Sequence, residues 1–354
     1  MLAQDALDGV LISTQHNFAW LSGGGLNGVD LSRENGVASL LVTRDARRYV
    51  ITNNIEMPRM LAEEVSAADF EPLEFGWQDG GRLLQLAREA AGGEARIASD
   101  VDWMDGLPPI EHRVASCRYQ LTAAEIDRYR QLGRDAGAAM KDVLANLKPG
   151  LTELEIGETV RHRLAEDGIT SVVTLVAVDE RIEKYRHPVP TSKRWSKTLL
   201  IVTCAKRQGL IVNLSRVVCA GTPDGHLIAK TEAAAYVNSV LMDATRPGTK
   251  ASELYAAAAQ AYAAKGFASE IDKHHQGGAT GYRTRDWVAH PDSSEVVQAG
   301  QAFAWNPSIT GTKVEESCIV VDDGVEIMTS SAGFPIITTV VNGKEYSSPG
   351  ILSI

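Results

Sequence analysis

The side chains best suited to chemistry in this sequence fall into three short segments, and the first surrounds His187. This histidine lies in RHPVPT, directly before Pro188. Proline fixes its own backbone and restricts the preceding residue to extended geometry. A histidine held in this way can take up or release a proton near neutral pH. We therefore expect His187 to act as an acid or base; the alternative is an exposed histidine in a turn.

The second segment, HHQGGATGYRTRDW (274–287), combines two histidines, two adjacent glycines and two arginines. The glycines allow a small ligand to approach the backbone closely. Tyr282, Arg283 and Arg285 are candidates for binding a substrate carboxylate, because a guanidinium can hold both oxygens at once. The alternative for each arginine is a salt bridge on the surface.

The third segment, AFAWNPSITGTKVEES (302–317), carries Asn306, Lys313 and Glu315. Lys313 and Glu315 are two residues apart, so they share one face if this segment is a strand. An amide and an ammonium are costly to bury without partners. This composition favours a polar binding site over a position that only packs.

The first part of the chain alternates strand-like and helix-like signals, which is typical of a small α/β domain. We predict such a domain over residues 1–115. Its expected strands cover 9–13, 37–43 and 48–53, and its expected helices cover 55–66 and 81–92.

Residues 108–122 break this alternation and are expected to link two domains. Thr122 and Glu125 then form a capping-box pattern, in which each side chain bonds the other residue's backbone N–H. The pattern predicts a long helix that ends at about Leu147.

The second part of the chain contains an internal duplication. Residues 147–168 and 245–266 share a Pro-Gly stop, a short polar link and an amphipathic segment that ends in glycine. Thr152 and Ser252 are the predicted helix caps, and the final glycine suits a left-handed C-terminal cap. Because strands follow each copy, the pattern predicts two duplicated α+β halves rather than a solenoid.

Together these features resemble the creatinase, aminopeptidase P and prolidase superfamily. His187 precedes two apolar strand-like runs, and residues 274–281 are similar to the superfamily phrase H-G-x-x-H-x-x-G. The phrase ISTQHNFAWLSGGG also resembles the opening of a creatinase-type N-terminal domain. The resemblance implies an α+β fold, with a pita-bread catalytic domain over 116–354 after the smaller α/β domain over 1–115.

The resemblance also implies five metal-ligand positions, and most of them have lost their ligand. One glutamate, two amides, one valine and one glycine cannot hold a pair of hard divalent cations. We therefore expect no metal and no cofactor. A different site made of His187, His274 and His275 stays open, because three imidazoles suit zinc. The five positions hold Val202, Asn213, Gly278, Asn306 and Glu315.

The function implied by the resemblance is a metal-independent, creatinase-like hydrolase, or a lyase. It would act on a C–N bond in a small amide-like or amino-acid-derived substrate. His187 would shuttle the proton, while Glu315 and His274 would orient water or the leaving group. The expected substrate-binding residues are Asn213, Arg216, Tyr282, Arg285, Asn306 and Lys313.

Two other functions stay open. One is a metal-dependent Xaa-Pro aminopeptidase or dipeptidase, and the other is a non-catalytic pita-bread protein that binds a macromolecule. Creatine is not an expected substrate, because Ser215 stands where creatinase has a glutamate that grips the guanidinium.

Composition excludes several classes of partner. A net charge of −10 over 354 residues, with no long cluster of Lys and Arg, argues against nucleic-acid binding. The apolar runs are shorter than the roughly 20 residues that cross a bilayer. The start of the chain lacks a basic region before an apolar core, and the four cysteines lack metal-binding spacing. We expect a cytoplasmic protein.

The resemblance implies a homodimer in which the N-terminal domain reaches the neighbour's active site. The candidates for lining that site are Arg33, Glu34, Glu56 and Arg59. The alternative for each is ordinary surface charge. A monomer by light scattering at micromolar concentration would contradict the dimer.

Overall fold

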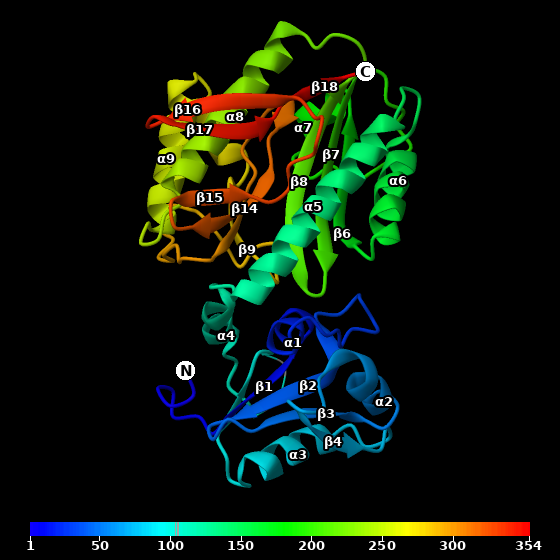
Figure 1. Ribbon diagram of the computed structural model, residues 1–354, viewed down its shortest axis with the longest axis vertical. Coiled ribbons are helices and arrows are strands. Elements are labelled where there is room, and N and C mark those ends of the chain that lie inside the picture. The colour runs from blue at the N-terminus through cyan, green and yellow to red at the C-terminus, as the bar shows by residue number, and fades with distance from the viewer. Residues whose placement is uncertain (103, 105) are drawn as a thin grey trace. The chain divides into compact units, whose positions relative to one another are not determined.

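The computed structural model describes residues 1–102, 104 and 106–354. These residues form two compact units, Met1–Arg118 and Tyr119–Ile354, where the sequence predicted a boundary at 115/116. Figure 1 follows the chain through the first unit in blue and cyan and through the second from green to red. Among the described residues, no helix is both long and apolar enough to cross a lipid bilayer.

The first unit is built on a five-stranded sheet in the order β4-β3-β2-β1-β5. Alternation along β1 places Val10 and Ile12 in one apolar cluster and Leu11 in another, so both faces of the sheet are covered. The strands are β1 (Gly9–Thr14), β2 (Asn35–Thr43), β3 (Arg48–Asn53), β4 (Glu71–Phe75) and β5 (Ile97–Ser99). The helices are α1 (Gln15–Leu21), α2 (Met57–Arg59) with the π-helical turn η1 (Met60–Glu64), α3 (Arg82–Ala91) and α4 (Glu111–Arg118).

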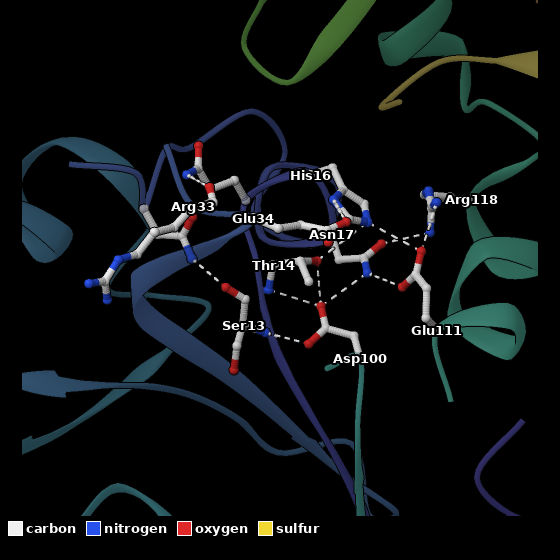
Figure 2. Close-up of polar contacts among 11 residues, drawn as sticks. Ser13, Thr14, His16, Asn17, Arg33, Glu34, Asp100, Glu111 and Arg118 are labelled. Carbon is white, nitrogen blue, oxygen red and sulfur yellow. Dashed lines mark hydrogen bonds and ion pairs between the residues drawn. The ribbon is translucent and has the colours of Figure 1, made fainter. Parts of the chain in front are cut away.

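Asp100 joins the end of β1 to the segment after β5 (Figure 2). Its carboxylate accepts hydrogen bonds from the backbone N–H groups of Ser13 and Thr14, at 2.8 and 3.0 Å. It also accepts from the hydroxyl of Thr14, at 2.6 Å, and from the side-chain amide of Asn17, at 3.0 Å. Four bonds to one buried carboxylate fix the start of α1.

Glu111 continues this polar network and explains why the expected linker contains a helix. Its carboxylate accepts from His16 at 3.2 Å, from Asn17 at 2.6 Å and from the guanidinium of Arg118 at 3.0 Å. Glu111 and Arg118 are the first and last residues of α4, so their ion pair spans that helix. The segment 108–122, which was expected to link the domains, therefore contains a helix that the sequence did not predict.

Acid should weaken the first unit through Glu111. Burial alone would raise the pKa of this carboxyl, but the His16 hydrogen bond and the Arg118 charge outweigh it and lower the pKa from 4.5 to about 2. A carboxyl with a lowered pKa stabilises the fold above its unfolded pKa, and this stabilisation is lost as pH falls from 4.5 toward 2. We expect Glu111→Gln to cost about 3 kcal/mol at pH 7 and much less near pH 2.5. Urea unfolding of the full chain at both pH values measures this.

The matched control is Glu71→Gln, which removes an exposed ion pair with Arg47. Exposed pairs contribute less than about 1 kcal/mol, so this variant should unfold much like the parent protein at both pH values. An equal cost for Glu111→Gln at pH 7 and pH 2.5 would contradict the assigned pKa.

The second unit contains two similar halves, as the duplication predicted. In the first half, α5 and α6 pack on a sheet in which β6, β7 and β8 are antiparallel and β18 joins β8 in parallel (Figure 1). Its elements are α5 (Ala123–Ala145), α6 (Glu153–Glu166), β6 (Thr170–Val178), α7 (Glu180–Lys184), β7 (Thr198–Arg207), β8 (Leu210–Cys219) and β18 (Ile351–Ser353).

In the second half, α8 packs on α9 and a five-stranded sheet runs in the order β10-β9-β11-β14-β15. The helical elements are α8 (Gly225–Ala244), α9 (Ala251–Ala264) and the 3-10 turn η2 (Ala268–Lys273). The strands of the sheet are β9 (Gly277–Thr280), β10 (Trp287–Val288), β11 (Ala302–Trp305), β14 (Glu316–Val321) and β15 (Gly324–Ile327). Two hairpins complete it: β12 (Ser308–Ile309) with β13 (Thr312–Lys313), and β16 (Ile336–Val341) with β17 (Lys344–Pro349).

Two of the three predicted helix caps are present in the structure. Complete capping boxes begin α5 at Thr122 and α6 at Thr152, as predicted. Ser252 was expected to cap α9, but the cap is Lys250, whose N–H donates to the carboxylate of Glu253 at 3.2 Å. The helix starts earlier than predicted because Glu253, three residues after Lys250, supplies the acceptor.

The two halves join where β8 meets the start of β14. The N–H of Ser215 donates to the carbonyl of Glu315 at 3.2 Å. Two residues earlier, the N–H of Asn213 donates to the hydroxyl of Ser317 at 2.7 Å, and that hydroxyl donates to the Asn213 carbonyl at 3.1 Å. This seam brings polar residues of both halves into the interior.

Candidate functional site

The centre of the candidate site is Glu315, held between two cations. Arg285 Nη2 lies 3.3 Å from one carboxylate oxygen, and Lys313 Nζ lies 3.8 Å from the other. Glu315 is only 2% exposed and Lys313 only 5%. We call these three residues the Glu315 clamp. A buried charge of this kind is tolerated only when opposite charges stand beside it.

The clamp carries more positive than negative charge. Burial lowers the pKa of Lys313, while Glu315 acts in the opposite direction by stabilising the ammonium. At 3.8 Å the ion pair is longer than a hydrogen bond. Lys313 therefore retains donor capacity toward a bound polar group.

Three histidines lie beside the clamp, and we call them the three-histidine cluster: His187, His274 and His275. Nε2 of His187 lies 3.1 Å from Nε2 of His274, and His274 stacks on His275 with 4.3 Å between ring centroids. His187 is exposed, on the loop between α7 and β7, whereas His274 and His275 follow η2 and are partly buried.

The environment keeps the three rings neutral. Burial, followed by the charges of neighbouring cations, lowers the pKa of His274 to about 2 and that of His275 to about 4. Burial and the Lys313 charge also lower the pKa of His187. Each ring therefore keeps one nitrogen lone pair at neutral pH.

Several buried polar atoms of the site have no hydrogen-bond partner among the described residues. Burying a polar group costs free energy unless it is hydrogen-bonded, and proteins seldom leave several such atoms in one region. A polar ligand or water would satisfy them, so the region has the composition of a binding site. The atoms are Asn213 Oδ1, Asn306 Oδ1, Glu315 Oε2, Arg285 Nε, His274 Nδ1 and His275 Nδ1.

Arg216 does not belong to this site, contrary to its predicted role in substrate binding. It is 1% exposed and pairs with Glu316 at 3.0 Å. The same guanidinium donates to the carbonyls of Ser215 and Thr329 and to the hydroxyl of Ser331. Because its N–H donors are already used in these bonds, Arg216 has a structural role, on the face of β8 opposite Asn213.

Tyr282 is likewise engaged elsewhere. Its hydroxyl donates to the carboxylate of Glu125 at 2.7 Å and accepts from Arg128 at 3.0 Å. Both partners belong to α5, so Tyr282 attaches the turn after β9 to that helix. The prediction that it binds substrate is not retained.

Sequence reasoning missed Arg186, which anchors the loop that carries His187. Its guanidinium donates to the carboxylate of Glu270 at 2.6 Å and to the hydroxyl of Thr310 at 2.9 Å. The position next to His187 was a signal, but Glu270 lies in η2, where no motif marks it.

The five inherited metal positions do not fit a pair of metal ions. Val202 belongs to an apolar cluster, and Asn213 and Asn306 offer only neutral amides. At Gly278, a Cβ would lie 2.0 Å from the carbonyl oxygen of Trp287, so no ligating side chain fits without a shift of the backbone. The remaining carboxylate, Glu315, is already neutralised by the clamp.

Comparison with known proteins gives related N-terminal and catalytic domains. The Creatinase/Prolidase N-terminal domain matches residues 1–146, and Metallopeptidase family M24 matches residues 127–329, more than half of the chain. An Xaa-Pro dipeptidase of Lactobacillus delbrueckii subsp. lactis is 23% identical over 229 residues. That match covers 62% of each protein, so the chain spans less than two thirds of its curated relative.

Solved structures share the fold at low identity. Dipeptidase PepE from Mycobacterium ulcerans has a TM-score of 0.78 at 18% identity, covering 100% of this chain and 95% of that one. The prolidase from Pyrococcus horikoshii OT3 has a TM-score of 0.78 at 17% identity, and the match covers 93% of this chain and 96% of that one. The N-terminal domain of FACT complex subunit SPT16 from chickpea (Cicer arietinum) has a TM-score of 0.71 at 12% identity, and the match covers 92% of this chain and 91% of that one.

The predicted architecture is confirmed: a creatinase-type N-terminal domain precedes an α+β pita-bread domain with duplicated halves. The chain belongs to metallopeptidase family M24, a family of hydrolases, within the creatinase, aminopeptidase P and prolidase superfamily.

Proposed function

We propose that this chain hydrolyses a C–N bond in a small amide-like or amino-acid-derived substrate without a pair of metal ions. The observation that carries the proposal is the Glu315 clamp. The one carboxylate that remains from the inherited ligand set faces Lys313 and Arg285. Two protein cations therefore stand beside the group that would otherwise bind metal.

The residues supply the parts that such a reaction needs. Hydrolysis of a C–N bond requires a base to take a proton from water and an acid to give one to the leaving nitrogen. His187 is exposed and bonded to His274, so it can perform both transfers in turn. Arg285 and Lys313 would stabilise negative charge that develops on the substrate oxygen. Asn213 and Asn306 present buried amides that can orient the substrate.

A metal-dependent Xaa-Pro dipeptidase is the second candidate, and the family comparisons favour it over the metal-independent function. The curated relative is named an Xaa-Pro dipeptidase, and similar structures are named prolidase and dipeptidase. These names support the amide bond of a dipeptide as the substrate class. The donor set supports a different mechanism, because four of its five positions lack an acidic or imidazole ligand.

Metal removal separates the two candidates. Under our proposal, turnover of a dipeptide or small amide persists after dialysis against EDTA, and added Mn²⁺ does not increase it. A metal-dependent dipeptidase would lose activity in EDTA and regain it with Mn²⁺. Metal content of the purified protein, measured by inductively coupled plasma mass spectrometry, gives an independent readout, with less than stoichiometric Mn and Co expected.

A further inference from the structure

We propose that the three-histidine cluster binds one zinc ion, or a similar divalent cation that prefers nitrogen ligands, and that this ion inhibits the enzyme. The cluster is separate from the inherited positions and shares none of their residues. It lies on the His187 loop and on the segment after η2. One potential ligand atom from each histidine lies within 4.8 Å of the other two.

The spacing of the rings suits coordination. Zinc binds imidazole nitrogen at 2.0–2.1 Å, so two nitrogens in a tetrahedral site lie about 3.3 Å apart. Nε2 of His187 and Nε2 of His274 are 3.1 Å apart. The same distance suits a hydrogen bond between the two rings, which satisfies the pair when no ion is bound.

An unpartnered nitrogen atom provides the second observation. Nδ1 of His275 is buried and has no hydrogen-bond partner among the described residues, so its lone pair is available to an ion. Stacking of the His274 and His275 rings holds both close to His187, with 4.9 and 6.0 Å between ring centroids. Three imidazoles with an open fourth position form a donor set that zinc accepts.

The neighbouring charges set the strength of binding and the identity of the fourth ligand. Lys313 and Arg285 are close enough to act electrostatically on these rings. Their positive charge opposes a divalent cation and attracts an anion. We therefore expect modest affinity, with hydroxide, chloride or a carboxylate in the fourth position.

The predicted inhibition by zinc rests on the proposed function, whereas the zinc site does not. If His187 shuttles protons, an ion that takes its lone pair stops that transfer. Chelators would then preserve or increase activity, which is the opposite of their effect on a two-metal peptidase. Binding of the ion itself does not depend on the reaction.

The binding test uses the full chain, ZnCl2 in isothermal titration calorimetry and CoCl2 in visible absorption, where a four-coordinate ion gives intense bands. We expect one ion per chain. His275→Ala should weaken binding about 100-fold, because losing a direct ligand costs at least as much as losing a residue that supports one. Zinc inhibition of this variant is measured relative to its own turnover in the absence of zinc.

Two further variants control the test. His162→Ala removes a histidine that is 81% exposed on α6, and it should bind zinc like the parent protein. Lys313→Met removes the nearby charge and should tighten binding about tenfold, whereas a merely destabilised protein would bind more weakly. Circular dichroism of each variant checks that it is folded.

The outcomes are distinct. Equal zinc affinity in the parent protein and His275→Ala, or no stoichiometric binding in the parent protein, would overturn the metal site. If binding behaves as expected, zinc should inhibit turnover in the parent protein and not in His275→Ala. Zinc binding without any detectable turnover of amides or dipeptides would leave the metal site standing and count against the proposed function.

Discussion

Replacing His187 by alanine is expected to lower kcat by about 10²–10⁴-fold, the usual contribution of a positioned acid or base. His187 is exposed, and among the described residues its side chain bonds His274. The fold should therefore tolerate the loss of the ring, and KM should change little if the residue moves protons rather than binding substrate. Steady-state kinetics on an amide or dipeptide substrate measures both constants.

His162→Ala is the control, because it removes an imidazole of the same kind from an exposed position on α6. It should retain parental kcat and KM. Full turnover by His187→Ala would remove the proton shuttle from the proposed mechanism, whatever the substrate.

Replacing Glu315 by glutamine is expected to destabilise the protein by about 3–5 kcal/mol, because it leaves two buried cations without their counter-charge. Arg285 and Lys313 are both held against this carboxylate. Turnover should also fall, since the clamp orients both cations. Urea unfolding and kinetics of the same preparation measure the two effects.

Glu158→Gln provides the matched control, because it breaks an exposed ion pair with Arg161 on α6. Such pairs contribute less than about 1 kcal/mol. The double variant Lys313→Met/Glu315→Leu should recover part of the stability lost in Glu315→Gln, since apolar replacements of a buried pair are often neutral. Parental stability in Glu315→Gln would show that the clamp is not the buried charge balance inferred here.

Local signals in the sequence predicted the elements well. Thr122 and Thr152 begin their helices as expected, because a capping box depends on residues only three positions apart. The internal duplication also predicted the two halves of the second unit, since each half repeats the same stops and caps. Ser252 failed as a cap because Lys250 and Glu253, three positions apart, offered a better-spaced pair.

The site was harder to predict because residue type does not tell which way a side chain faces. On β8, Asn213 and Arg216 are three residues apart, and alternation along a strand therefore places them on opposite faces. The same rule separates Glu315, which faces the clamp, from Glu316, which pairs with Arg216. Applied to β8, alternation alone would have separated Arg216 from the other candidates.

Contacts between distant segments were harder still to predict. The bond between Arg186 and Glu270 joins residues that are 84 positions apart, and no motif marks Glu270. The site of His187, His274 and His275 was left open by the sequence, and their clustering depends on how η2 meets the loop after α7. Such proximity follows from packing of the whole unit.

The closeness of β10 to Gly278 has a consequence for engineering. Reintroducing acidic residues at Asn213 and Asn306 alters side chains only, but a histidine at position 278 collides with main-chain atoms of a neighbouring strand. A ligand set for two metal ions at these positions would therefore need a remodelled sheet edge as well as new side chains. The course of the polypeptide, and not only the choice of side chains, limits which groups can be placed there.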